Sequence, residues 1–166
     1  MRLHPLPVAW ALACTTLLSL GRPTSSAAGE AAAPFNLRTL DGKPLRSADF
    51  KGQPMVVDFW ATWCTPCRAT MPHLDALQQH FRDSGLVVIG FSVDDGSPQQ
   101  VKRYAEKLGV KMRLAMAPGS MLEDYGPIRS IPTTFFIDRH GMIVRRVVGY
   151  VDGETMETFA REIVAR

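Results

Sequence analysis

The length and composition of the chain predict one folded domain. Its 166 residues, 46% of them hydrophobic and 21% charged, are enough for a core and argue against disorder or a repeat protein. The formal net charge is only +3, and the basic residues form no cluster of the kind that binds nucleic acid. We therefore expect no nucleic-acid partner.

Residues 1–28 have the layout of a secretory signal peptide. Arg2 precedes an apolar stretch over residues 8–20, and small residues follow as far as Ala28. The apolar stretch is about 13 residues long, whereas a membrane-spanning helix needs roughly 20. We therefore expect an exported, periplasmic protein that is cleaved near Ala28 and leaves a domain of residues 29–166. An uncleaved membrane anchor is the alternative.

Removal of this segment would leave two cysteines, Cys64 and Cys67, in one Cys-x-x-Cys motif. A lipoprotein acylated on Cys14 is disfavoured, because the apolar run continues beyond that cysteine. In an oxidising compartment a structural disulfide should close a long loop, whereas a ring this small contributes only about 2 kcal/mol. The pair is better suited to being formed and broken.

The chain from residue 34 to residue 93 predicts a hairpin, a strand, a helix and a second strand. Residues 34–51 contain an Asp-Gly turn between short apolar segments, which is typical of a hairpin at the edge of the core. Residues 55–60 form a short apolar strand that only Asp58 interrupts. Residues 86–93 are almost continuously apolar, as in a central parallel strand. The helix between the two strands has a repeating apolar face, namely Leu74, Leu77 and Phe81.

The next segment predicts a second helix, then a further strand and a helical turn. Residues 97–100, Ser-Pro-Gln-Gln, combine an N-cap, a proline in the first turn and a glutamine that completes a capping box. Gly109 ends this helix. Residues 112–116 are a candidate strand, and residues 120–123 begin a short helical turn.

The last part of the chain predicts an antiparallel hairpin and a final helix. Residues 133–137 and 142–148 are rich in β-forming residues and are joined by a turn. Asp152 is the expected N-cap of the final helix. The order of these elements gives one α/β domain.

The Cys-x-x-Cys motif follows a strand and opens a helix, which has a definite chemical use. The sulfur of Cys64 would lie beyond the helix N-terminus, where unpaired N–H groups stabilise a thiolate. This thiolate could attack a substrate disulfide, and Cys67 could then resolve the mixed disulfide from one turn further along. Pro66 suits the first turn, where no N–H is needed.

Two other uses of a cysteine pair fit less well. A zinc site needs further ligands, and only His73, His80 and His140 remain; His73 and His80 lie seven residues apart on one helix face, for which solvation is the simpler explanation. A peroxidatic cysteine would need a Pro-x-x-x-Thr-x-x-Cys setting, and Val57 stands where that proline should be. We therefore expect neither a metal nor a cofactor.

Two motifs in the right order resemble the thioredoxin superfamily, specifically its exported TlpA/ResA/CcmG-like branch. The first is residues 57–68, VDFWATWCTPCR, with Met71 and Pro72 following, and the second is residues 130–135, SIPTTF, which resembles the cis-proline loop. The resemblance covers about Phe35 to the C-terminus. It implies a thioredoxin-like α/β fold with a central mixed sheet flanked by helices, an N-terminal hairpin region, and a strand and helix inserted before the cis-proline loop.

The resemblance also implies roles for individual residues. Pro132 would be cis and lie against the Cys64 sulfur, and Ile131 would offer backbone hydrogen bonds to an extended substrate peptide. Trp63 would flank the exposed sulfur and contribute to substrate binding. Trp60 would pack beneath it, although a plain core role fits equally well.

Asp58 and Thr70 bear on acid–base chemistry. A lone acid inside an apolar strand is costly unless it has a partner or a function. The resemblance implies that Asp58 is a buried proton acceptor for the resolving thiol of Cys67; the alternative is an acid at a strand end that reaches water. ResA-like reductases have an active-site glutamate three residues beyond the second cysteine, where this chain has Thr70. Asp58 would then be the only acid–base group for the cysteine pair. This difference from ResA-like reductases argues against assigning the chain their narrow role in cytochrome maturation.

The expected function is a periplasmic thiol:disulfide oxidoreductase that reduces protein disulfides, such as those of apocytochrome c or of copper-site cysteines. Because such a protein cannot stay reduced unaided in an oxidising compartment, a membrane-embedded thiol donor of the DsbD type is implied as its electron source. A net disulfide oxidant is one alternative. A copper or zinc carrier that uses the same two cysteines is another.

Overall fold

The computed structural model describes residues 29–166, and the predicted signal peptide lies outside these residues. Within the described part of the chain, no helix is long and apolar enough to cross a membrane. The elements in chain order are β1 (Asn36–Arg38), β2 (Pro44–Arg46), η1 (Ser47–Phe50), β3 (Met55–Trp60), α1 (Thr65–His80), η2 (Arg82–Ser84), β4 (Val87–Ser92), α2 (Pro98–Lys107), β5 (Arg113–Met116), α3 (Met121–Asp124), β6 (Thr133–Ile137), β7 (Ile143–Val148) and α4 (Gly153–Val164).

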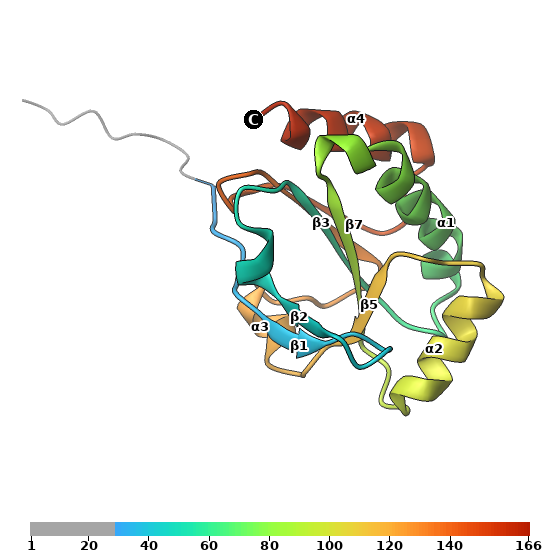
Figure 1. The fold of residues 1–166 in the computed structure, drawn as a ribbon. Coiled ribbons are helices and arrows are strands. Elements are labelled where there is room, and N and C mark those ends of the chain that lie inside the picture. Colours follow the sequence, from blue (N-terminus) through green and yellow to red (C-terminus); the bar gives the residue numbers. More distant parts are fainter. Residues whose placement is uncertain (1–28) are drawn as a thin grey trace, which may run out of the picture.

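The central sheet is mixed and has five strands in the order β5-β4-β3-β6-β7 (Figure 1). Strands β3, β4 and β5 are parallel, whereas β6 runs antiparallel to β3, and β7 antiparallel to β6. Every residue of β3, β4 and β6 is buried, as expected for strands covered on both faces. The predicted α/β class and mixed sheet are confirmed.

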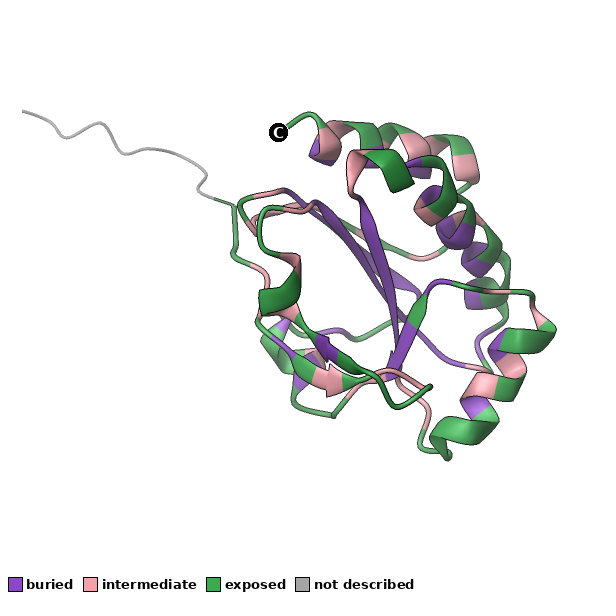
Figure 2. Ribbon diagram, viewed as in Figure 1, coloured by how far each residue is buried: buried purple, intermediate pink, exposed green. Residues whose placement is uncertain are grey.

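Two layers cover the sheet, and each has its own cluster of buried side chains (Figures 1 and 2). Helices α1, α2 and α4 contribute to one cluster, while the β1–β2 hairpin and α3 contribute to the other. Successive side chains of β3 point alternately into the two clusters. Val56 and Trp60 face the three helices, and Val57 and Phe59 face the hairpin. Full burial of each such side chain contributes about 1.5–3 kcal/mol.

The N-terminal hairpin closes one edge of the sheet, as the sequence predicted. Strands β1 and β2 pair with each other, and the hairpin then meets the edge strand β5. Thr39 bridges to Ala115, and the Leu40 N–H donates a hydrogen bond to the Leu114 carbonyl at 2.8 Å. The hairpin thereby pairs with an edge that would otherwise be open to other chains.

Local sequence signals set the helix boundaries. In α2 the Ser97 side chain accepts from the Gln100 N–H, and the Gln100 side chain accepts from the Ser97 N–H, which is the predicted capping box. Asp152 caps α4 by accepting from the Thr155 N–H at 2.9 Å. Helix α2, strand β5 and helix α3 lie between β4 and the cis-proline loop, where a strand and a helix were expected to be inserted.

Candidate active site

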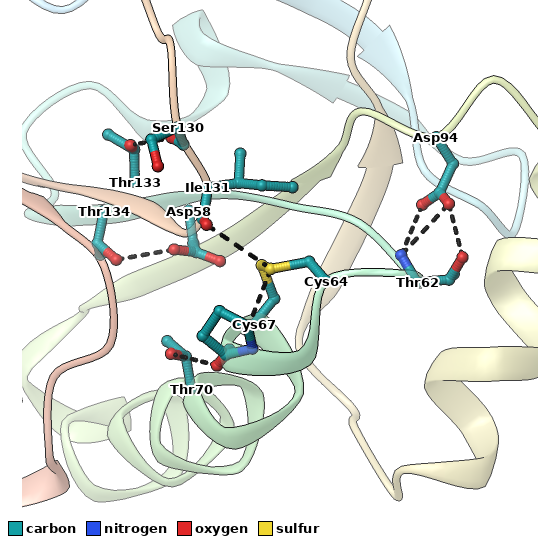
Figure 3. The surroundings of a disulfide bond; sticks show 11 residues. Asp58, Thr62, Cys64, Cys67, Thr70, Asp94, Ser130, Ile131, Thr133 and Thr134 are labelled. Carbon is teal, nitrogen blue, oxygen red and sulfur yellow. Dashed lines mark hydrogen bonds between the residues drawn. A yellow bond between two sulfur atoms is a disulfide. The ribbon is translucent and has the colours of Figure 1, made fainter.

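Cys64 and Cys67 form a disulfide at the N-terminus of α1 (Figure 3). Their Cα atoms are 5.3 Å apart. Cys64 is the N-cap of the helix, and its sulfur accepts a hydrogen bond from the Cys67 N–H at 3.2 Å. Because the N–H groups of a first turn have no helical partner, this position favours negative charge on the Cys64 sulfur once the disulfide is reduced.

Cys64 is less exposed than predicted. Cys67 is completely buried, and Cys64 is only 5% exposed and so is not the exposed sulfur that the resemblance implied. In the disulfide form, the Cys64 sulfur lies 3.7 Å from the Ile131 carbonyl oxygen. Since a disulfide sulfur carries no proton, this approach is a contact and not a hydrogen bond. Cys64 remains the more accessible of the two.

The cis-proline loop lies against the disulfide because of the sheet topology. Strand β6 is antiparallel to β3 and begins at Thr133, opposite Phe59, so the residues before it are placed beside the carboxyl end of β3. The Ile131–Pro132 peptide bond is cis, as the resemblance implied. The Gly149 N–H donates to the Pro132 carbonyl at 2.8 Å and fixes the loop to the end of β7.

Asp58 is a buried acid on the same face of the sheet as the disulfide. It is two residues from both Val56 and Trp60 and so shares their face of the strand, and both of these pack in the cluster that contains Cys64 and Cys67. Its side chain is completely buried, which contradicts the alternative of an acid that reaches water. Thr134 donates a hydrogen bond to Asp58 Oδ1 at 2.7 Å, and Oδ2 has no partner. Burial raises the pKa of Asp58 from its ordinary value of 3.8 to about 7.

Comparison with known proteins identifies the family. The sequence pattern of the AhpC/TSA family matches residues 28–146, most of the chain. The chain belongs to this family. It is 33% identical over 130 residues to the thioredoxin-like protein YneN of Bacillus subtilis (strain 168), covering 78% of this chain and 76% of that one. It is 29% identical over 135 residues to the thiol-disulfide oxidoreductase ResA of Bacillus thuringiensis (strain Al Hakam), covering 81% and 78%.

A solved structure agrees with these relatives. The crystal structure of a thiol:disulfide interchange protein of the thioredoxin family from Chlorobium tepidum TLS superposes with a TM-score of 0.77 at 30% sequence identity. The match covers 84% of this chain and 99% of that one. This AhpC/TSA protein is thus a thioredoxin-like thiol:disulfide oxidoreductase of the ResA type.

Trp60 lies beneath the cysteine pair in this AhpC/TSA protein and also belongs to the core. It is buried in the same cluster as both cysteines and stacks on Tyr104 with ring centroids 6.4 Å apart. A Cβ atom on Gly90 would lie 2.6 Å from Leu114 Cδ2 and 3.1 Å from Trp60 Nε1. The glycine therefore leaves the room that the indole occupies, and the two suggested roles of Trp60 are compatible.

Thr70 does not supply the acid that a glutamate at this position would. It is buried on α1, and its hydroxyl donates to the Pro66 carbonyl at 3.1 Å, within the helix (Figure 3). The first turn of α1 contains no acidic residue. Asp58 is therefore the acid that the structure places behind the cysteine pair.

His80 of α1 is exposed and His73 is half-buried, which agrees with the expected solvated helix face, and both lie beside α4 or the loop before it. The hydroxyl oxygen of Tyr150 and Nε2 of His73 are 3.5 Å apart, and Nε2 of His80 lies 3.6 Å from a carboxylate oxygen of Glu157. Residues 29–166 hold no group of three or more His, Cys, Asp or Glu side chains placed to bind a metal ion.

Sequence reasoning missed Asp94, which holds the loop before Cys64. The Thr62 N–H donates to Asp94 Oδ2 at 3.0 Å, and the Thr62 hydroxyl donates to Oδ1 at 2.6 Å (Figure 3). The Ser92 hydroxyl also donates to Oδ2, at 2.7 Å. The available signal was a pair of polar residues, Ser92 and Asp94, at the carboxyl end of a buried strand. The parallel strands β3 and β4 both end at this edge of the sheet.

We expect Asp94→Ala to loosen the loop that carries Trp63 and Cys64. The substitution leaves the half-buried Thr62 N–H without its acceptor, which costs about 1–2 kcal/mol of unfolding free energy. Urea denaturation measures that loss, and hydrogen exchange at the Thr62 amide measures the loosening. Asp95→Ala, which removes the exposed neighbouring acid, is the matched control and should change stability by less than about 0.5 kcal/mol. Equal protection of the Thr62 amide in both variants would contradict the role of Asp94.

Proposed function

We propose that the protein is an exported dithiol reductant of protein disulfides that acts in the periplasm after cleavage near Ala28. The observation that carries this proposal is the buried Asp58 on the same face of the sheet as the cysteine pair. When Asp58 is charged, its negative charge disfavours the thiolate form of the nearby cysteine pair. Strong oxidants owe their potential to an unusually stable reduced form, so Asp58 favours the reducing direction.

The proposed reaction has two exchange steps. The Cys64 thiolate attacks one sulfur of the substrate disulfide, forms a mixed disulfide and expels the other substrate sulfur as a thiolate. Asp58 Oδ2 then accepts the thiol proton of Cys67, and the Cys67 thiolate attacks the Cys64 sulfur and expels the second substrate sulfur. The substrate gains two electrons, and the protein ends with the Cys64–Cys67 disulfide, the state that the structure describes.

The surface around the disulfide supports a polypeptide substrate. Among the described residues, the large hydrophobic side chains that are exposed are Trp63, Val148 and Tyr150. Trp63 directly precedes Cys64, and the two others flank Gly149, which is bonded to Pro132. An extended peptide lying along Ile131 would therefore have exposed apolar side chains near its cysteine. We propose cysteine pairs in apocytochromes c or copper-binding proteins as substrates.

The proposed direction requires an electron source. After each turnover the protein is oxidised, and an oxidising compartment does not reduce it again. A membrane-embedded thiol donor of the DsbD type would supply the two electrons through its own dithiol. The domain of residues 29–166 would then shuttle between this donor and its substrates.

The reduction potential of the Cys64–Cys67 pair tests the proposed direction. We expect a value near the roughly −270 mV of thioredoxin and far from the roughly −120 mV of DsbA. Equilibration of the protein with defined ratios of reduced and oxidised glutathione measures it, with the fluorescence of Trp60 and Trp63 as the signal. A variant with both cysteines replaced by serine gives the baseline. A potential above about −150 mV would place the protein among the oxidants and overturn the proposal.

A further inference from the structure

Asp58 and Thr134 form a cross-strand pair inside the sheet. The two residues lie directly opposite each other in the antiparallel pairing of β3 with β6, and both are buried. The Thr134 hydroxyl donates to Asp58 Oδ1 at 2.7 Å, and the two side chains point toward each other in Figure 3. Because the strands fix both backbones, this hydrogen bond is built into the sheet and does not depend on a flexible side chain.

The two carboxylate oxygens of Asp58 have different surroundings. Oδ1 accepts the Thr134 hydrogen bond, whereas Oδ2 is buried without a partner in the described structure. On the other side of β3, the residue opposite Asp58 is Gly90, which has no side chain to offer. Neither Thr134 nor Gly90 titrates. The titratable residues in or against the cluster on this face are Cys64, Cys67 and Tyr104. The buried Asp75 of α1 is held by the Lys111 and Met112 N–H groups. The unpaired oxygen is therefore the one free to exchange a proton with the cysteine pair.

We propose that Thr134 is a positioning residue, which holds Oδ1 of Asp58 and thereby leaves Oδ2 as the oxygen that receives the Cys67 proton. The proposal rests on the proposed role of Asp58 as proton acceptor. A buried carboxylate with no hydrogen bond is strongly disfavoured relative to its protonated form. The Thr134 hydroxyl stabilises the charged form and so opposes the effect of burial on the pKa of Asp58. Without it, the carboxyl would stay protonated near neutral pH and could not accept a proton.

The test compares the wild type with Thr134→Val, which keeps the shape of the side chain and removes the hydroxyl. Carbon-13 NMR of the Asp58 carboxyl in the oxidised protein reports its titration without interference from the cysteines, which do not titrate as a disulfide. A hydrogen bond to a charged group changes an ionisation constant by roughly tenfold or more. We expect the Asp58 titration, and the pH midpoint of substrate reduction, to move upward together in Thr134→Val. Thr134→Ser, which restores a hydroxyl, should return both toward the wild type.

Three further variants separate this proposal from the function on which it rests. Thr133→Val removes the neighbouring hydroxyl, which donates to the Ser130 carbonyl, and should leave the Asp58 titration unchanged. Asp58→Asn alone and Asp58→Asn with Thr134→Val should have the same pH profile, because Thr134 acts only through the acid. If Asp58→Asn alters the profile of the wild type while Thr134→Val does not, only the assignment of Thr134 is wrong.

An unaltered pH profile in Asp58→Asn would show that the proton-acceptor role itself is wrong, and the assignment of Thr134 falls with it. A Thr134→Val protein that does not fold would be replaced by Thr134→Ala, which also lacks the hydroxyl but fits into a smaller space. The expected upward movement of the Asp58 titration is the same for both substitutions.

Discussion

Replacing Cys67 with serine is expected to stop the reaction at the mixed disulfide and to reduce multiple-turnover reductase activity to background. Cys64 caps α1 and keeps the helix N–H groups that stabilise its thiolate, so the first exchange step survives. The serine hydroxyl cannot attack a disulfide, so the substrate remains bound to Cys64. Non-reducing electrophoresis and mass spectrometry of the purified variant, after incubation with an oxidised protein substrate, measure the trapped complex.

Cys64→Ser is the matched control and should trap nothing, because it lacks the attacking sulfur. Alkylation of the reduced wild type at mildly acidic pH gives an independent check. Cys64 should react first, since it is the more accessible cysteine and has the lower pKa expected of a helix N-cap. Faster labelling of Cys67 would reverse the two roles.

The features that the sequence predicts best are those that depend on residues close together in the chain. The capping box of α2 depends on Ser97 and Gln100, which are three residues apart, and the structure contains it as expected. The burial of Asp58 follows from its place within an apolar strand, and full burial is what the structure has. The fold class followed from the order of such local elements together with the resemblance to a known family.

Contacts between distant residues could not be predicted in this way. The bond of Thr134 to Asp58 joins residues 76 apart and requires the register of β6 on β3. The bonds of Asp94 to Thr62 join residues 32 apart and require two parallel strands to end at one edge of the sheet. The low exposure of Cys64 goes with a contact to the Ile131 carbonyl oxygen, which lies 67 residues further along the chain.

Asp58→Asn is expected to slow the reduction of protein disulfides near neutral pH while the fold is retained. The Cys67 thiol loses its proton acceptor, a loss that typically costs about 100-fold or more when the proton transfer limits the rate. In the wild type, activity should rise with pH as Asp58 loses its proton around its pKa of about 7. That rise should be absent from the variant, and stopped-flow measurement of the pH–rate profile checks it. A profile identical to that of the wild type would make Asp58 a structural residue.

The same substitution should increase stability, in a way that depends on pH. Burial raises the pKa of Asp58 in the folded protein to about 7, above its ordinary value of 3.8. The contribution of its protonated form to folding is therefore complete below about pH 4 and is lost as the pH rises through 7. Asparagine does not titrate, so Asp58→Asn should match the wild type at pH 4 and exceed it by up to about 4 kcal/mol at pH 8. Urea denaturation of the oxidised proteins at pH 4, 6 and 8 measures this difference, in which the titration of the other residues cancels. A constant difference across the three pH values would mean that the pKa of Asp58 is the same in the folded and the unfolded protein, so that burial does not raise it.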